Sequence, residues 1–381
     1  MAPDAPDVQA IAIQYGAAYL ATHPASPDQR KVLWALQSCR TAALGGHVDA
    51  CDAYGVLRIS YNSCRNRHCP QCQTLNQVRW GQARLSDLLD VGYFHVVFTL
   101  PAALNAVALQ NPRIVYGLLF QAAAETVAEL AADPHYLGAQ IGMTAVLHTW
   151  GQNLQLHPHL HCVIPGGGLT PEGQWQPSRK KFFLPVKVLS RKFRGKFLAL
   201  LQAAPLTFYG ALADPAAFQT LLAPLYAQDW VVYCKAPFAS AAHVVAYLGR
   251  DTHRVAIANS RIVRVADGLV TFRWRDYRDD NRLKLMTVTA EEFLRRFLLH
   301  VLPTGFTRIR HYGFLSARNK STQLRRCQQL THTLPSAEAA LPESDVALFT
   351  QLTGRDATLC PVCHAGHLQW ARASPPERLS A

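Results

Sequence analysis

Residues 156–168 read LHPHLHCVIPGGG and place His157, His159 and His161 at alternate positions. Because successive side chains on a β-strand point to opposite faces, His159 and His161 share one face and the residue between them turns to the core. His157 joins them only if Pro158 leaves the strand pairing regular. Two imidazoles on a rigid strand can bind a divalent cation and leave coordination positions open for a phosphate oxygen. The alternative is a polar face at a sheet edge.

Segments typical of strands and helices lie on both sides of this stretch. Residues 93–100 (YFHVVFTL) are β-branched and aromatic and end at a proline, and residues 141–150 precede the histidines across a polar turn. Further strands are expected at residues 230–234, 261–265, 269–274 and 283–288, and helices at residues 73–89, 112–132, 241–250 and after a Thr289-x-x-Glu292 capping box. Strands and helices alternate without a long βαβ series, so we predict an α+β fold and not a doubly wound parallel sheet.

Cysteines gather in a basic, loop-rich stretch near the N-terminus. Two spacings interleave there, Cys39-x7-His47 with Cys64-x3-His68, and Cys51 with Cys69-x2-Cys72. A C-x2-C pair places two thiolates on one tight turn, which suits tetrahedral zinc. The second set has only three cysteines, because Tyr54 stands where a C-x2-C partner of Cys51 would be expected. We predict a structural zinc module with one or two ions; reduced cysteines without metal are the alternative.

A second cluster of potential ligands lies near the C-terminus. Its members are Cys360, Cys363, His364 and His367. It forms either a knuckle closed by both histidines or half of a site that is completed from elsewhere in the chain.

The overall composition narrows the classes of function. The chain has 381 residues, 49% of them apolar, and carries 38 Lys and Arg against 25 Asp and Glu, a net charge of +13. Such an excess favours a polyanionic partner, most often nucleic acid. The best candidate for a membrane span, residues 91–110, is interrupted by His95, Pro101 and Asn105, and the acidic N-terminus lacks signal-peptide character. We therefore expect a cytoplasmic protein without membrane association, in which cysteines bind metal and do not form disulfides.

One segment concentrates the positive charge. Residues 179–197 contain eight Lys and Arg and no acid, and four phenylalanines lie among them. The cations expected to contact DNA are Lys180, Lys181, Arg191, Lys192, Arg194 and Lys196 of this segment, together with Arg250 and Arg254 further along the chain. Such a segment suits a groove for single-stranded DNA in which Phe182, Phe183, Phe193 and Phe197 stack on bases. The alternative is a solvated basic face under which the phenylalanines pack.

Residues 241–254 read AAHVVAYLGRDTHR and predict an amphipathic helix. Spacing by four places His243, Tyr247 and Asp251 on one face, with Arg250 and Arg254 beside it. Taken alone, the pattern favours a buried structural tyrosine. Beside a metal-binding strand it indicates a nucleophile, because a phenol with a pKa near 10 attacks only a phosphate that a metal and nearby cations polarise.

These motifs together resemble a known family, the HUH-endonuclease transposases of bacterial insertion sequences, of the insertion-sequence-ninety-one type that moves by a rolling-circle route. The matching stretches are CRTAALGGH, YNSCRNRHCPQCQ, LHPHLHCVIPGGG, YLGRDTHRVAIANSRI, DYRDDNRLKLMTV and FLLHVLPTGFTRIRHYGFL, in the family's order. His159 and His161 match the metal-binding histidines and Tyr247 the first nucleophilic tyrosine. Asp251 stands where a second tyrosine is often found, and Tyr54 where a zinc-ligand cysteine is usual.

The resemblance implies an antiparallel-sheet HUH nuclease core with helices, preceded by a small zinc-binding module. The expected organisation is an extension at residues 1–29, a zinc module at 30–90, a catalytic domain at 91–330 and a tail at 331–381. It further implies Mg²⁺ or Mn²⁺ at the histidines, of which Mn²⁺ suits imidazole better, and Zn²⁺ in the module.

The expected function is a DNA transposase that nicks single-stranded or hairpin DNA at element ends and transfers the strand to target DNA. Asp251 is a candidate third metal ligand; an acid paired with Arg250 or Arg254, or a lost nucleophile position, are the competing interpretations. Asp251 and Tyr54 also leave open a catalytically decayed, zinc-dependent DNA-binding protein or regulator. A zinc hydrolase that uses the three histidines would need neither Tyr247 nor the positive charge.

Overall fold

The structure is a computed structural model, and it describes residues 6–179, 183–238, 256–333 and 341–376. The chain packs as two compact units, each assembled from separate stretches of sequence. Unit 1 comprises Met1–Gln82, His253–Val301 and Glu338–Ala381, and unit 2 comprises Ala83–Thr252 and Leu302–Ala337. The domains expected from the sequence are continuous stretches of chain, whereas these units are defined by which residues pack together. Most of the C-terminal tail therefore belongs to the same unit as the cysteine-rich N-terminal stretch.

Unit 2 is built on a five-stranded sheet in which all neighbouring strands are antiparallel. Its strands in spatial order are β12 (Ile309–Gly313), β4 (Gly142–Trp150), β5 (Leu156–Pro165), β3 (Tyr93–Thr99) and β8 (Val232–Phe238). The prediction of a mixed helical and antiparallel-sheet fold is confirmed. The histidine stretch forms β5, the central strand.

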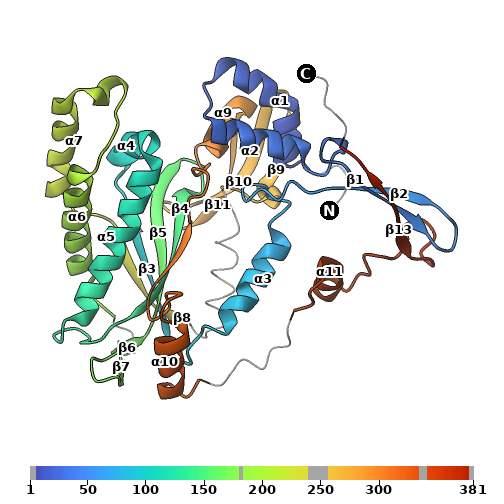
Figure 1. Cartoon of the computed structure of the whole chain (residues 1–381). Coiled ribbons are helices and arrows are strands. Elements are labelled where there is room, and N and C mark those ends of the chain that lie inside the picture. The colour runs from blue at the N-terminus through green and yellow to red at the C-terminus, as the bar shows by residue number, and fades with distance from the viewer. Residues whose placement is uncertain (1–5, 180–182, 239–255, 334–340, 377–381) are drawn as a thin grey trace. The chain divides into compact units, whose positions relative to one another are not determined.

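Helices cover one face of this sheet (Figure 1). They are α4 (Asn105–Gln110), α5 (Pro112–Ala132), α6 (Val186–Ala203) and α7 (Pro215–Ala227). The core beneath them takes alternate residues of each strand, such as Phe94, Val96 and Phe98 of β3 and Leu160 and Cys162 of β5. Because side chains alternate across a strand, the residues between these positions, including His95, His159 and His161, lie on the opposite face.

Helix α5 is long and apolar enough to cross a membrane by length and composition. The best candidate for a membrane span in the sequence analysis was residues 91–110, whereas it is α5 that meets this criterion. In the structure 61% of the most apolar 18-residue segment of α5 is buried inside unit 2. Such burial is typical of a core helix in a globular protein.

Smaller elements complete unit 2. A hairpin joins β6 (Gly167–Leu169) to β7 (Trp175–Pro177), and α10 (Arg325–Leu330) follows a single π-helical turn at Lys320–Leu324. Helix α3 (Thr74–Leu85) runs across the boundary between the sequences of the two units. Short 3₁₀ turns occur at Ala102–Leu104 and Gly210–Ala213 in unit 2, and at Ala42–Leu44 and Asn259–Arg261 in unit 1.

Unit 1 contains two three-stranded sheets. One has the order β13 (Leu368–Ser374), β1 (Gly46–Cys51), β2 (Leu57–Tyr61), and the other β11 (Arg282–Thr289), β10 (Leu269–Asp276), β9 (Ile262–Ala266). Helix α9 (Ala290–Leu298) packs on β10 and on α1 (Val8–Thr22), which in turn contacts α2 (Pro27–Ser38). Helix α11 (Asp345–Thr353) belongs to the tail.

Candidate metal centres

Three histidines of unit 2 bring ligand atoms together on the sheet face that the helices leave uncovered. One nitrogen of each of His148, His159 and His161 lies within 4.8 Å of the others. His159 and His161 come from β5, and His148 of β4 is the direct cross-strand partner of His159. His148 had no place among the residues expected from the sequence. His157 is exposed at the start of β5 and is not in this group.

The tautomer of His159 is fixed by its own strand. Its Nδ1 lies 2.6 Å from the backbone carbonyl oxygen of His157. A carbonyl oxygen only accepts hydrogen bonds, so Nδ1 carries the hydrogen and donates it. In a neutral imidazole the lone pair then resides on Nε2, which is the form that binds a metal ion.

His161 is oriented in a similar way by a side chain of the neighbouring strand. Its Nδ1 lies 2.9 Å from Nε2 of His95 on β3, and the two rings stack with centroids 5.1 Å apart. If His161 donates through Nδ1, its Nε2 carries the lone pair that can bind an ion, and His95 holds the ring in place. His95 was missed in the sequence analysis as well. It is the third residue of the predicted strand YFHVVFTL, where it is a polar side chain among apolar ones.

Burial keeps these imidazoles neutral. It lowers the pKa of His159 to about 4, with a smaller contribution from His157. It also lowers the pKa of His95 to about 4, helped by the charge of Lys235, and holds the pKa of His161 well below its ordinary value. Neutral nitrogens at physiological pH are metal ligands and not cations, so the electrostatics of the face suit cation binding.

The predicted nucleophile helix falls in residues 239–255, outside the described residues. Tyr247, Asp251, Arg250 and Arg254 are therefore not placed by the structure. Their assigned roles stay predictions.

Four cysteines of unit 1 form a compact cluster. One sulfur from each of Cys39, Cys64, Cys69 and Cys72 lies within 4.8 Å of the others. The measured Sγ–Sγ distances are 3.4 Å for Cys39–Cys72, 3.6 Å for Cys64–Cys72 and 3.7 Å for Cys39–Cys69. A tetrahedral zinc ion with Zn–S bonds of about 2.3 Å has thiolates about 3.8 Å apart. Hydrogen bonds from the neighbouring thiols, Cys64 first, lower the pKa of Cys39 to about 7. Hydrogen bonds with Cys39 also lower the pKa of Cys72, and they raise the pKa of Cys64 and of Cys69.

This arrangement corrects the grouping predicted from spacing. His47 is not in the cluster; its Nε2 lies 3.3 Å from Asp49. His68 is also outside it, with Nδ1 3.1 Å from the side-chain oxygen of Asn66. Cys51 is separated from Cys69 and Cys72 because β1 carries it to the other end of the strand from the cluster.

Cys51 instead meets the tail. Its sulfur and those of Cys360 and Cys363 lie within 4.8 Å of one another, and Cys51 and Cys363 are 3.6 Å apart. Of the two alternatives for the C-terminal cluster, the structure favours half a site completed from elsewhere. His364 and His367 do not join this group, and Nε2 of His367 lies 3.5 Å from Asp356.

Comparison with known proteins identifies the family. A family model described as "Transposase zinc-binding domain" matches residues 11–100, and one described as "Putative transposase" matches residues 142–322. The chain is 53% identical over 379 residues, 97% of this chain and 95% of the relative, to "Putative transposase y4qJ" of Sinorhizobium fredii. The chain belongs to the IS91 family of transposases. It is also 27% identical over 291 residues, covering 74% of this chain and 68% of the relative, to the transposase for insertion sequence element IS801 of Pseudomonas savastanoi pv. phaseolicola.

Two solved structures show a partial likeness to this transposase. The conjugative relaxase TrwC in complex with mutant oriT DNA covers 30% of this chain and 46% of its own, at 17% identity and a TM-score of 0.24. A metal-free structure of TrwC with oriT DNA covers 42% and 71%, at 13% identity and a TM-score of 0.23. Scores this low carry no argument about the site.

The basic segment of the transposase forms helix α6, and its phenylalanines do not face solvent. Phe183, Phe193 and Phe197 are buried, and Phe193 packs against Phe98 with ring centroids 4.9 Å apart. The prediction that these three rings stack on DNA bases is wrong, because they fill the core between α6 and the sheet. Lys180, Lys181 and Phe182 lie outside the described residues.

The cations of α6 differ in their surroundings. Lys192 and Lys196 pair with Glu129 of α5, at 2.8 Å and 2.5 Å, and Arg194 donates to the carbonyl oxygen of Gln228 at 2.7 Å. Arg191 is exposed. The face is thus a solvated basic surface, partly neutralised by α5, and its contact with DNA stays a prediction.

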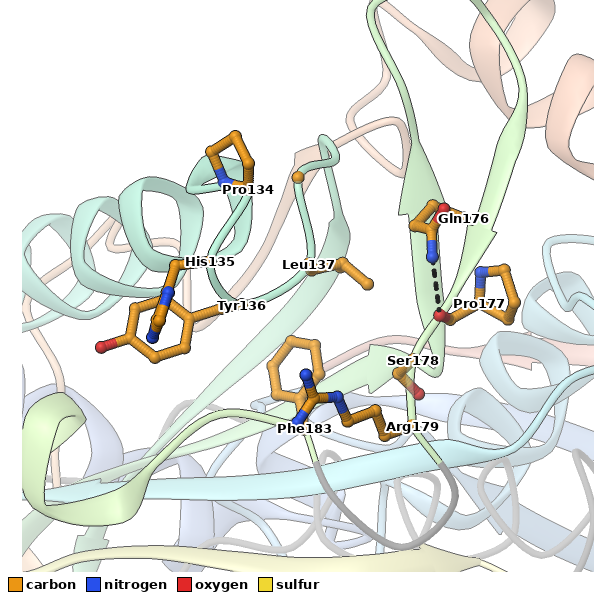
Figure 2. Close-up of a pocket in the computed structure, with 10 residues that line it drawn as sticks. Pro134, His135, Tyr136, Leu137, Gln176, Pro177, Ser178, Arg179 and Phe183 are labelled. Atoms are coloured by element: carbon orange, nitrogen blue, oxygen red, sulfur yellow. Dashed lines mark hydrogen bonds between the residues drawn. The ribbon is translucent and has the colours of Figure 1, made fainter.

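A pocket of about 420 Å³ also lies in unit 2, between residues 134–138 and the strand β7 (Figure 2). Arg179, Ser178 and His135 are among the polar residues that line it, together with Phe183 (Figure 2). None of the clustered histidines lines this pocket, so it is separate from the candidate metal centre.

Proposed function

We propose that this IS91-family transposase nicks single-stranded or hairpin DNA at the ends of its element and transfers the strand to target DNA. The observation that carries the proposal is the group of three imidazoles on the strands β4 and β5, with the tautomer of His159 already set for metal binding. The net charge of +13 favours a polyanionic substrate.

The nucleophile in this proposal is Tyr247. Its phenolic oxygen forms a bond to phosphorus while the bond from phosphorus to the 3′ oxygen breaks on the opposite side. The phenolic proton passes to solvent, and the leaving 3′ oxygen takes up a proton. The products are a 5′-phosphotyrosine and a free 3′-OH. A later 3′-OH can reverse the step, because the phosphodiester energy is kept in the phosphotyrosine.

His148, His159 and His161 would hold a divalent cation. When bound, such an ion supplies positive charge that neutralises and polarises the scissile phosphate. Three imidazole nitrogens suit Mn²⁺ better than Mg²⁺, which prefers oxygen. Other residues of the chain orient these ligands. The His157 carbonyl oxygen fixes the ring of His159, and the His95 ring fixes that of His161. The core packing of β5 keeps the two imidazoles at a constant spacing.

Zinc has a separate, structural role in the proposal. Cys39, Cys64, Cys69 and Cys72 would bind one Zn²⁺, since their sulfurs already lie close to the corners of a tetrahedron of the right size. Such a site is closed by four protein ligands and contributes to folding.

Cleavage of an oligonucleotide from an element end tests the proposal. A 3′-labelled strand should remain bound to the protein through denaturing electrophoresis with Mn²⁺, and a 5′-labelled fragment should be released with an extendable 3′-OH. Tyr247→Phe should abolish both and keep DNA binding. Tyr233→Phe, which alters an exposed tyrosine of β8, is the matched control. A covalent adduct formed by Tyr247→Phe contradicts the assignment, and binding without nicking by the wild type indicates the decayed, regulatory alternative.

A further inference from the structure

A group of three cysteines joins two parts of the chain that are far apart in sequence. Cys51 is the last residue of β1. Cys360 and Cys363 lie just before the tail strand β13, and Cys363 follows Cys51 by 312 residues in the sequence. Strands β1 and β13 are antiparallel neighbours (Figure 1). Cys51 lies opposite Leu368 in their register. Cys51 and Cys360 are 2% and 0% exposed, so these thiols are withdrawn from solvent.

Backbone N–H groups point at two of the three sulfurs. The N–H of Gly366 donates to Sγ of Cys363 at 3.3 Å, and the N–H of Ala365 also bonds to that sulfur. On the other side, the N–H groups of Tyr54 and Ala53 bond to Sγ of Cys51. At Cys363 these hydrogen bonds lower the pKa of the thiol, which favours the charged form that binds metal. At Cys51 burial and the neighbouring thiols outweigh them, and the pKa is raised.

A glycine permits the close approach of the two turns. A Cβ at Gly366 would lie 2.7 Å from Sγ of Cys51 and 2.7 Å from the Asp52 carboxylate. The same carboxylate accepts the N–H of His367 at 2.7 Å, and the N–H of Asp52 donates to the His367 carbonyl at 3.0 Å. The turn after Cys51 and the turn after Cys363 are therefore joined by two reciprocal hydrogen bonds between Asp52 and His367. The absence of a side chain at Gly366 leaves room for the sulfurs between these turns.

A tetrahedral ion needs a fourth ligand that this group does not provide. Within the described residues, no further His, Cys, Asp or Glu joins the three thiols. Tyr54 occupies the position that would complete a C-x2-C turn with Cys51, and it is 72% exposed. A cysteine at that position would share the turn whose N–H groups already contact the Cys51 sulfur.

We propose that Cys51, Cys360 and Cys363 bind a second zinc ion, whose fourth coordination position is open to solvent because residue 54 is a tyrosine. Three thiolates select a borderline-soft ion such as Zn²⁺ over Mg²⁺ or Mn²⁺. An ion with one exchangeable ligand is held less tightly than the ion in the four-cysteine cluster. The proposal is independent of DNA cleavage.

Zinc analysis of the full-length protein tests this inference. The wild type should contain two zinc ions per chain, one of which a chromogenic chelator removes faster than the other. Cys363→Ser should lose the fast ion and keep the slow one. Tyr54→Cys should slow removal of the fast ion at least ~10-fold, because a fourth thiolate replaces solvent. Tyr277→Cys, which places a thiol at an equally exposed tyrosine (70% exposed), is the control and should change nothing.

Cobalt substitution gives a readout that does not depend on folding yield. The charge-transfer absorption per Co²⁺ scales with the number of thiolates, so Tyr54→Cys should raise it at the second site and Tyr277→Cys should not. One zinc ion per wild-type chain, two ions in Cys363→Ser, or a disulfide between Cys51 and Cys363 in freshly purified protein would each overturn the proposal. Equal removal rates for the wild type and Tyr54→Cys would overturn the open fourth position.

Discussion

His148 lies directly across the β4–β5 ladder from His159, and their ring centroids are 5.4 Å apart. The pairing follows from the register of a hairpin whose turn closes with the N–H of Gly151 on the carbonyl of Gln155 at 2.9 Å. A one-residue slip would move every histidine of β5 to the apolar face, so the buried core of the sheet fixes the position of the candidate metal centre.

His148→Ala should raise the Mn²⁺ concentration needed for half-maximal nicking at least ~10-fold, because it removes one of three imidazoles. The measurement is a metal titration of the oligonucleotide cleavage assay. His135→Ala, at an exposed histidine outside the cluster, is the control. An unchanged metal requirement in His148→Ala would remove this residue from the ligand set.

Asp251 offers a competing third ligand, so its variants discriminate between the two arrangements. With His148 in the ligand set, we expect Asp251→Ala to shift the Mn²⁺ requirement less than His148→Ala does. Asp251→Asn should shift it less still. The opposite order would assign the third position to Asp251. A second covalent DNA adduct in Asp251→Tyr would show that the position is that of a lost nucleophile.

His95→Ala should weaken metal binding about 10–100-fold, since the His95 ring orients His161 through the hydrogen bond between His95 Nε2 and His161 Nδ1. His95→Gln keeps a side-chain partner near that position and should restore part of the loss. Thermal unfolding of each variant separates orientation from folding: a positioning role predicts a changed Mn²⁺ requirement at an unchanged melting temperature. Equal behaviour of Ala and Gln would contradict it.

Cys69→Ser should remove the zinc ion of the four-cysteine cluster and destabilise unit 1, because structural zinc binding contributes about 10–16 kcal/mol of apparent free energy in small zinc domains. His47→Ala, at a histidine that spacing alone had assigned to zinc, should retain the ion. Metal analysis with thermal unfolding checks both. Zinc loss in His47→Ala would restore the ligand set predicted from spacing.

Local sequence patterns predicted much of unit 2. The strands β3, β4 and β5 and helix α5 were found to within one or two residues, because period-two alternation and a long apolar run bounded by Pro112 are local signals. His148 was missed because one histidine in a strand has no local signature. Combining the predicted turn at residues 151–153 with antiparallel register would have placed it opposite the β5 histidines.

Other parts of the site depend on contacts that spacing does not encode. The interleaved cysteines could be grouped in several ways, and the choice is made by β1, which separates Cys51 from Cys39, and by a tail strand far along the chain. The prediction that Phe193 and Phe197 of α6 stack on DNA bases was wrong for a different reason. Their spacing by four continues through Leu189 and Leu201, all buried, so the helical period itself indicated a core stripe.

The tail strand has a consequence for how the protein is made. Cys363 leaves the ribosome 312 residues after Cys51, which at about 5–20 residues per second takes about 15–60 s. During that interval β1 has β2 on one side and an unpaired edge on the other. Synthesis of β13 is thus required to finish the first sheet, so a chain that ends before Cys360 would have an open edge at β1 and a Cys51 thiol without its two partners.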